Sequence, residues 1–346
     1  MMSPPLRSLE PASVSALLAI IVLVAGCASN SAIAPSPPGT LLLVAEDATS
    51  TLAEIEPNSG HVRHRYTVAG PVVSIALARN GQYAATIDAT GEVVVCDLPR
   101  QGIDARYRIE GAGTVTALAF ADRRSTLVAS FDDAGDVRVF GRESGRLERA
   151  ISTGSSRVIA LCPGFAVGEI IAACEGPARL VRLDTESGRT LESVALDGTP
   201  RSLARGSDFQ TTLVALDVGG HLELWSSGRR IAAAFEGPIE LSPTRVEHTI
   251  VASEPASGSL FILDAAGSRR VRVASPDPSV TTPWRTALDP SGRYAFVAIP
   301  SSERVVVVDV ASGSVRGEYT GLSRPSAIAW TFQRAPPGFD LHLGRD

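Results

Sequence analysis

The sequence predicts an all-β fold, and three observations support this prediction. From residue 40 onward the chain consists of runs of four to eight residues rich in Val, Ile and Leu, separated by Gly, Asp, Ser and Pro, which is typical of strands. No segment in this region shows a sustained helical stripe of apolar residues at i, i+3, i+4 and i+7. Groups of four such runs recur every 40 to 43 residues, which is typical of the blades of a β-propeller.

The repeats can be counted from their starting points. Six whole repeats begin at Pro71, Thr114, Arg157, Pro200, Glu240 and Thr281. The piece 40–70 that precedes them lacks a first strand, whereas the segment 325–332 (PSAIAWTF) supplies a first strand without successors. Because the two incomplete ends complement each other, we predict that they form one shared blade, which leaves no sheet edge open in the ring. The prediction is a seven-bladed β-propeller, closed by N-terminal strands plus a C-terminal strand, in a single domain over 40–332.

Two of the repeats resemble those of known propeller families. Residues 287–315 (ALDPSGRYAFVAIPSSERVVVVDVASGSV) resemble a YVTN-type repeat, and residues 114–146 (TVTALAFADRRSTLVASFDDAGDVRVFGRESGR) resemble a WD40-type repeat. The Gly-His and Trp-Asp dipeptides of WD40 repeats are mostly missing. The resemblance covers 40–332 and implies the fold, but propellers host many unrelated activities, so it implies little about function.

The N-terminus is typical of an export signal. The apolar run 14–26 would span roughly 20 Å as a helix, which is too short for a hydrocarbon core of about 30 Å. The segment 23–27 (LVAGC) resembles the bacterial lipobox. That resemblance implies that the signal peptide 1–26 is removed and that Cys27 becomes the lipidated, palmitate-bearing first residue. An ordinary secretory signal with a chance Cys is the alternative.

The domain boundaries and the location follow from these features. Residues 27–39 comprise the lipidated Cys and a Pro- and Ser-rich flexible tether, and 333–346 form a C-terminal tail. The resemblance implies a protein of the cell envelope, attached to the membrane by its lipid. In a Gram-negative cell it favours the outer membrane facing the periplasm, because Ala28 rather than Asp follows the Cys. The choice between inner and outer membrane stays open.

Composition excludes several classes of function. All 32 side-chain cations are Arg, so lysine-based Schiff-base, pyridoxal-phosphate and P-loop chemistry is excluded. The net charge of -5 does not favour a phosphate-tracking surface, and we expect no nucleic-acid partner.

An acidic residue recurs directly after the second strand of most repeats. These candidate partner-binding residues are Asp47, Asp88, Asp132, Asp133, Glu175, Asp217 and Glu254. In the last repeat Pro300 and Ser301 take this place. Since the corresponding turns open on one face of a propeller, the acids would form a rim. They either accept hydrogen bonds from the tight turns or form an electronegative rim that docks a basic partner or a cation.

Arginines and cysteines allow narrower expectations. Arginines concentrate in the fourth strands and the turns before them, which fits a solvated outer edge, with contact to anionic lipid or glycan as the alternative. With a turn centred near Phe165 and Ala166, Cys162 would face Glu169, and Cys174 would face Arg157. That register separates the two Cys by about 17 Å, so we expect no disulfide between them.

No catalytic or metal-binding motif stands out. None of the five His lies in a metal-binding spacing, and there is no GxSxG, CxxCH or EF-hand motif, so we expect no cofactor. The favoured hypothesis is a lipid-anchored, non-catalytic scaffold that binds envelope proteins. The alternative is a lactonase- or quinoprotein-like enzyme, or a propeller that binds a small ligand or cation, with its site at the mouth of the central channel.

Overall fold

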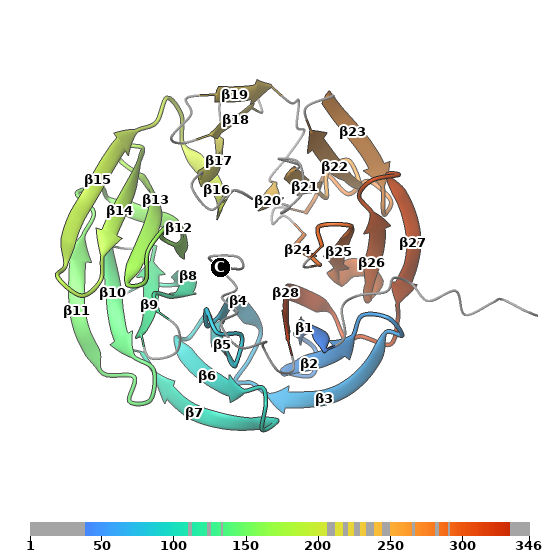
Figure 1. Ribbon diagram of the computed structural model, residues 1–346, viewed down its shortest axis with the longest axis horizontal. Helices are drawn as coiled ribbons and strands as arrows, with labels where there is room; N and C mark the ends of the chain where they lie inside the picture. The colour runs from blue at the N-terminus through green and yellow to red at the C-terminus, as the bar shows by residue number, and fades with distance from the viewer. Residues whose placement is uncertain are drawn as a thin grey trace, which may run out of the picture.

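The computed structural model describes most of the chain from Gly39 to Phe332. The described ranges are 39–109, 113–122, 126–132, 134–205, 212–216, 221–224, 229–232, 239–243, 250–264, 267–280, 284–289 and 291–332. They form seven four-stranded antiparallel sheets arranged around a central axis (Figure 1). The predicted seven-bladed β-propeller is therefore confirmed.

The strands fall into four concentric sets. The innermost strands are β4 (Val72–Leu77), β8 (Val115–Phe120), β12 (Arg157–Pro163), β16 (Pro200–Arg205), β20 (Glu240–Pro243), β24 (Thr286–Leu288) and β28 (Pro325–Phe332). The second strands are β1 (Thr40–Glu46), β5 (Tyr83–Asp88), β9 (Thr126–Phe131), β13 (Glu169–Glu175), β17 (Thr212–Leu216), β21 (Ile250–Glu254) and β25 (Tyr294–Ile299). The third strands are β2 (Thr51–Glu56), β6 (Glu92–Asp97), β10 (Asp136–Gly141), β14 (Arg179–Asp184), β18 (His221–Leu224), β22 (Ser259–Asp264) and β26 (Arg304–Asp309). The outermost strands are β3 (His61–Thr67), β7 (Gly102–Arg108), β11 (Leu147–Ser152), β15 (Arg189–Ala195), β19 (Arg229–Ala232), β23 (Gly267–Arg272) and β27 (Ser314–Tyr319).

We number the blades along the chain. Blade 1 is β4 to β7, blade 2 is β8 to β11, blade 3 is β12 to β15, blade 4 is β16 to β19, blade 5 is β20 to β23 and blade 6 is β24 to β27. Blade 7 has the order β28-β1-β2-β3 and therefore combines the two ends of the described chain. Its closing pair runs from Thr40 opposite Phe332 to Glu46 opposite Pro325, as the complementary ends of the sequence predict.

The hydrophobic core lies between the blades. Among the described residues, seven buried clusters each join residues of two neighbouring blades. Between blades 1 and 2, for example, Ile87 belongs to the same cluster as Phe120 and Phe131. Because each sheet is covered on both sides, its second strand is buried along most of its length, and all six residues of β25 are buried. This explains why the sequence shows continuous apolar runs rather than alternation.

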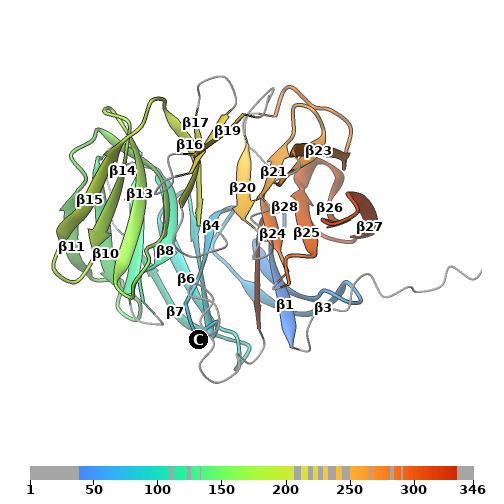
Figure 2. The ribbon, with the colours of Figure 1, turned by 45° about the horizontal axis from the view of Figure 1, so that its top comes forward.

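The ring has two unlike faces. Val72 at the start of β4 pairs with Asp88 at the end of β5, and the same arrangement recurs for Arg157 and Glu175 in blade 3. Innermost strands thus begin on the face that carries the turns between second and third strands, which we call the mouth face. Turns between innermost and second strands lie on the opposite side, which we call the floor face (Figure 2).

The outermost strands carry a repeated irregularity. In blades 7, 1, 2, 3 and 6 one extra residue interrupts the pairing of the third and outermost strands. These bulged residues are Arg63, Asp104, Glu148, Leu191 and Arg316. A bulge, especially one with a charge, makes an exposed edge a poor template for pairing with another chain.

Several arginines in or near the outermost strands bond to a neighbouring blade instead of only facing solvent. Arg106 of blade 1 donates to the Thr67 carbonyl of blade 7 at 2.8 Å, and Arg269 of blade 5 donates to the Ala311 carbonyl of blade 6 at 2.7 Å. Arg142, in a turn of blade 2, is buried and pairs with Asp104 of blade 1. These side chains fasten neighbouring blades together.

The register predicted for the two cysteines of blade 3 is wrong. Cys162 lies opposite Ile171 rather than Glu169, and Cys174 lies opposite Val158 rather than Arg157. The turn is centred one residue later than expected, and a bulge near the start of β12 adds a residue. Three rows, or about 10 Å, then separate the cysteines, which is still beyond the reach of a disulfide. Cys96, Cys162 and Cys174 are buried and form no disulfide.

Candidate binding site at the mouth of the central channel

A second set of bulges lies where the innermost strands begin. In blades 1, 2, 3, 4 and 7, the pairing of the innermost and second strands skips one residue near the start of the innermost strand. These residues are Val73, Thr116, Ile159, Arg201 and Ser326. Bulges re-aim side chains and are frequent near binding sites. Five blades thus place chemically different residues at equivalent positions on the mouth face.

Most of the predicted acids that the structure describes on the mouth face have partners, but only Asp88 is engaged within its own turn. Asp88 accepts hydrogen bonds from the backbone N–H groups of Thr90 and Glu92, at 2.8 and 3.0 Å. Asp132 accepts one from the N–H of Thr114 at 2.7 Å. The contacts of Asp88 are the turn-stabilising role that short acidic side chains commonly take, whereas Asp132 joins the end of β9 to the start of β8.

The remaining described acids of this set differ from one another. Asp47 accepts hydrogen bonds from the Val72 N–H at 3.2 Å and from the Ser326 hydroxyl. Glu175 forms an ion pair with Arg157 at 3.1 Å, and Glu254 is fully buried. Asp133, Asp217 and Cys27 lie outside the described residues. The rim as a partner-binding surface therefore stays a prediction.

Glu46, directly before Asp47, has a buried carboxylate that accepts hydrogen bonds from several donors. Arg65 Nε lies 2.8 Å from its Oε2, and the N–H of Ser323 lies 3.1 Å from its Oε1. Burial acts to raise the pKa of Glu46, but the hydrogen bonds from Arg65, Ser323 and Thr51 outweigh it and hold the pKa below its ordinary value. This carboxylate thus ties β1 to the loop that leads into β28.

A cavity of about 500 Å³ opens on the mouth face between blades 6, 7 and 1. We call it the mouth pocket. Its lining residues are Asp47, Val72, Val73, Val280, Trp284, Arg285, Pro300, Ser301, Arg324 and Ser326. Two of them, Val73 and Ser326, are bulged residues of the innermost strands. The pocket combines an apolar wall with a few polar groups, which is the usual composition of a ligand site.

The mouth pocket contains two arginines, Arg285 and Arg324. In blade 6 the turn after the second strand begins with the short 3-10 segment η1 (Pro300–Ser302), and its acid, the exposed Glu303, lies at the end of the turn rather than at the start. Arg285 precedes β24 of this blade and forms an ion pair with Glu240 at 2.7 Å. The Glu240 carboxylate raises the pKa of Arg285. Arg324 precedes β28, and its backbone has the left-handed φ of 55°. The mouth pocket thus brings the turn of blade 6 together with two arginines.

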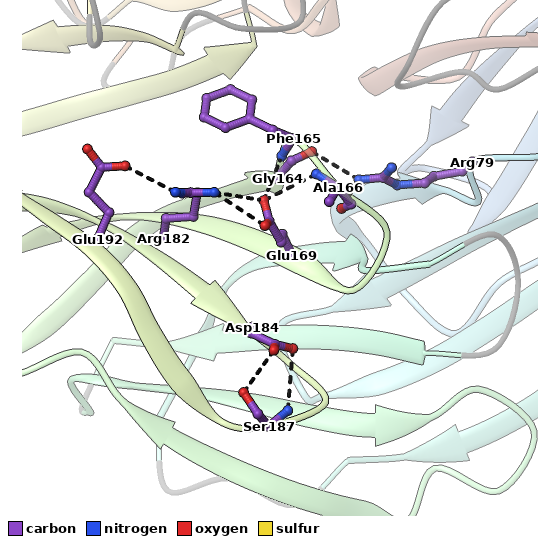
Figure 3. Close-up of polar contacts among 9 residues, drawn as sticks. All are labelled: Arg79, Gly164, Phe165, Ala166, Glu169, Arg182, Asp184, Ser187 and Glu192. Carbon is purple, nitrogen blue, oxygen red and sulfur yellow. Dashed lines mark hydrogen bonds and ion pairs between the residues drawn. The ribbon is translucent and has the colours of Figure 1, made fainter. Parts of the chain in front are cut away.

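On the floor face, Arg79 connects turns of two different blades. This residue lies in the turn between β4 and β5 of blade 1 and is fully buried. Its Nη2 donates to the carbonyls of Gly164 and Ala166, at 2.9 and 2.7 Å, in the turn between β12 and β13 of blade 3 (Figure 3). One side chain therefore bridges two blades that are not neighbours.

A radial polar network holds the turn that Arg79 reaches. Glu169 accepts hydrogen bonds from the N–H groups of Phe165 and Ala166, at 3.1 and 3.2 Å. Arg182 on β14 pairs with Glu169 and also with Glu192 on β15, as Figure 3 shows. The turn on the floor face is thus braced from the outermost strand of blade 3 to blade 1.

The polar residues of the mouth pocket and of the floor were missed by sequence reasoning. Arg79, Arg285 and Arg324 each occur at a position where the repeats share no pattern. One signal was visible, because the loss of the acid at Pro300 and Ser301 marked blade 6 as unlike the others. Within the described ranges, no three His, Cys, Asp or Glu side chains are grouped so that they could hold a metal ion. No helix in the same ranges is long and apolar enough to cross a membrane.

Comparisons with known proteins identify the fold. The sequence matches no family model and no curated protein. A functionally unknown protein from Desulfotomaculum acetoxidans DSM 771 has a similar structure, with 14% identity, a TM-score of 0.65, and coverage of 84% of this chain and 99% of that chain. Dihydro-heme d1 dehydrogenase NirN, in complex with DHE, is similar at 14% identity and a TM-score of 0.60, over 85% of this chain and 75% of that chain. These likenesses show a β-propeller fold, which agrees with the seven sheets of this chain.

Proposed function

We propose that this protein is a lipid-anchored propeller of the cell envelope that acts as a non-catalytic scaffold and binds a partner protein at its mouth face. The observation that carries the proposal is the mouth pocket, which is walled by three blades of a closed ring. A rigid ring that presents a preformed pocket can bind a partner with little loss of conformational entropy on its own side.

The placement of side chains on the two faces supports this choice of surface. The bulged residues on the mouth face vary from Val to Arg between blades, whereas the acids Asp88 and Asp132 beside them accept hydrogen bonds from backbone N–H groups of their own blades. The floor face at blades 1 and 3 is instead occupied by the contacts of Arg79. Variable side chains on a fixed frame are what a recognition surface requires.

The location rests on the sequence. The lipobox-like segment 23–27 supports attachment through Cys27, and the tether 27–39 would let the propeller stand off from the lipid surface. In a Gram-negative cell we place the protein at the outer membrane, facing the periplasm.

Site-specific photocross-linking in intact cells tests the proposal. A photoreactive residue at Ser301, which lines the mouth pocket and is exposed, should capture one envelope protein in stoichiometric amounts. The matched control is Glu143, an exposed residue in a floor-face turn of blade 2, which should capture none. Equal capture from both positions, or none from either, would reject the scaffold.

A small-molecule role is the second candidate, and the size of the mouth pocket favours it. A volume of about 500 Å³ lies within the range of roughly 300–1,000 Å³ that is typical of ligand sites. Native mass spectrometry of the purified protein would reveal a retained ligand, and elemental analysis would reveal a metal. A tightly held molecule or ion in a protein without a partner would favour this candidate over the scaffold.

A further inference from the structure

The mouth pocket presents hydrogen-bond donors that no described residue uses. The guanidinium of Arg324 has no hydrogen-bond partner among the described residues, and only Nη1 of Arg285 is paired, with Glu240. The exposed hydroxyl of Ser301 likewise has no partner within the described ranges. An arginine offers five N–H donors and no acceptor. These donors, which water satisfies when the pocket is empty, match a ligand that supplies acceptor oxygens.

The acceptor on the opposite wall is already engaged. Asp47 Oδ1 receives the N–H of Val72 and the hydroxyl of Ser326. The lining holds two arginines, but Glu240 already balances the charge of Arg285, so Arg324 is the lining cation without a carboxylate partner among the described residues. One such cation matches a ligand group with a single negative charge better than a phosphate dianion, whose second charge would stay unbalanced.

The rest of the lining is apolar. Val72, Val73, Trp284 and Pro300 form much of the wall, and Trp284 is nearly buried. The ligand therefore needs an apolar group next to its charge. A peptide residue with an aliphatic side chain and a carboxylate meets both requirements within the available volume.

The backbone conformation of Arg324 is a further sign that the mouth pocket is a binding site. Its left-handed backbone is unfavourable for an ordinary side chain and is held by the N–H of Asp47, which donates to the Arg324 carbonyl at 3.2 Å. Strained residues that the surrounding structure over-determines are concentrated at binding sites. Here the same aspartate fixes both the start of β4 and the residue that carries the free guanidinium.

We infer that the mouth pocket binds a single carboxylate group joined to an apolar side chain, as presented by an extended peptide of the partner protein. Arg324 and Arg285 receive the carboxylate, and Val73 with Trp284 packs against the side chain. This inference rests on the proposed function, because it takes the ligand to be part of a protein.

Calorimetric titration of the purified full chain with small probes tests the inference. N-acetyl-leucine should bind, whereas N-acetyl-leucinamide, which lacks the charge, should bind at least about tenfold more weakly. Inorganic phosphate should not displace N-acetyl-leucine. Equal binding of the amide, or displacement by phosphate, would overturn the inference.

Substitutions locate the binding in the pocket. Arg324→Asn should weaken N-acetyl-leucine binding by about tenfold, and Asn is chosen because it tolerates a left-handed backbone. Ser301→Asp should weaken it as well, through repulsion at an exposed position that does not affect folding. The control Arg316→Gln removes an exposed arginine from the outermost strand of blade 6 and should leave binding unchanged. Unchanged binding in both Arg324→Asn and Ser301→Asp would contradict the assignment.

Peptides distinguish the source of the carboxylate. A short peptide with a C-terminal Leu and a free carboxylate is compared with its amidated form and with an amidated form that carries an internal Glu. Binding of the free-carboxylate peptide alone identifies a chain terminus as the source of the carboxylate. Binding of the amidated peptide with the internal Glu identifies an acidic side chain, and both results support the inference. If Ser301 still cross-links the partner in the Arg324→Asn variant, the scaffold survives and the carboxylate site fails. If N-acetyl-leucine binds but no partner is captured, the carboxylate site survives and the scaffold fails.

Discussion

Arg79 is a fully buried cation whose energetic role depends on two carbonyls in a distant turn. Its Nη2 donates to the carbonyls of Gly164 and Ala166, which lie two blades away. A buried acceptor that loses its donor costs about 1–3 kcal/mol. The side chain therefore stabilises the ring through groups that would otherwise be left without a partner.

Replacing Arg79 by Met should lower the free energy of unfolding by roughly 2–4 kcal/mol, because both carbonyls lose a charged donor while the apolar stem is kept. Urea unfolding followed by fluorescence measures this change. The matched control is Arg100→Met, since Arg100 is 83% exposed and forms only a surface pair with Asp97. That control should change stability by less than about 1 kcal/mol. Equal midpoints for the two variants would contradict the role of Arg79.

Glu46 should make the stability of blade 7 depend on pH. Its pKa is lower in the folded protein than the ordinary value of 4.5, so its contribution is fully present above that value. The contribution is lost as the pH falls through the folded pKa. The difference in stability between the native chain and Glu46→Gln should therefore be large at pH 7 and shrink below pH 4.5. Denaturation at a series of pH values measures it, and a constant difference would contradict the lowered pKa.

At the level of the elements, one turn contact joins blades 6 and 7. Gly60 lies between β2 and β3 with a left-handed φ of 71°, and a Cβ there would lie 2.6 Å from Cδ1 of Tyr319 on β27. The Tyr319 hydroxyl donates to the Pro57 carbonyl, which fixes the ring in place. A similar contact joins Tyr107 of blade 1 to Gly145 of blade 2. Glycine is required in these turns for both its conformation and its size.

Gly60→Ala should destabilise the protein by about 2–3 kcal/mol, from the strained backbone and the collision with Tyr319. Gly321→Ala is the matched control, because Gly321 has a φ of 75° but nothing within 4 Å of the added Cβ. This control should show only the backbone cost, about 1–2 kcal/mol. The difference between the two unfolding midpoints measures the contact, and no difference would show that the tyrosine ring moves aside freely.

At the scale of the whole molecule, the proposed attachment to the membrane would depend on one residue, Cys27. Cys27→Ser should release the protein from the membrane fraction, because a serine cannot carry the lipid that the lipobox resemblance implies. Fractionation of cells that express each form measures the effect, and Ala28→Ser serves as the neighbouring control. Continued membrane association of Cys27→Ser would reject the anchor.

The architecture could be predicted from the sequence because the same strand pattern recurs in every repeat, so a strand that is ambiguous in one repeat can be assigned from the others. Starts expected at Pro71, Thr114 and Arg157 lie within one residue of the observed innermost strands. The sixth start, expected at Thr281, comes five residues early relative to β24, which is only three residues long. The segment between those positions contains Trp284 and Arg285, which line the pocket instead of extending the strand.

The candidate site was harder to predict from the sequence, because its residues come together only when the two ends of the chain pair and close the ring. Asp47 and Arg324 are far apart in the sequence, yet both line the mouth pocket because β28 pairs with β1. Spacing within a repeat contains no information about such a junction. The acids could be placed on one face, but their partners, such as Thr114 for Asp132, depend on turn geometry that the composition does not reveal.

The position of β1 has a mechanical consequence. A force applied to the chain ahead of Thr40 pulls along the axis of β1, which is held by β28 on one side and β2 on the other. The hydrogen bonds of both ladders lie across the direction of pulling and must yield together in shear. A tether joined to an outermost strand would instead peel its bonds away one after another. The strand that closes the ring is thus also the one best placed to resist tension.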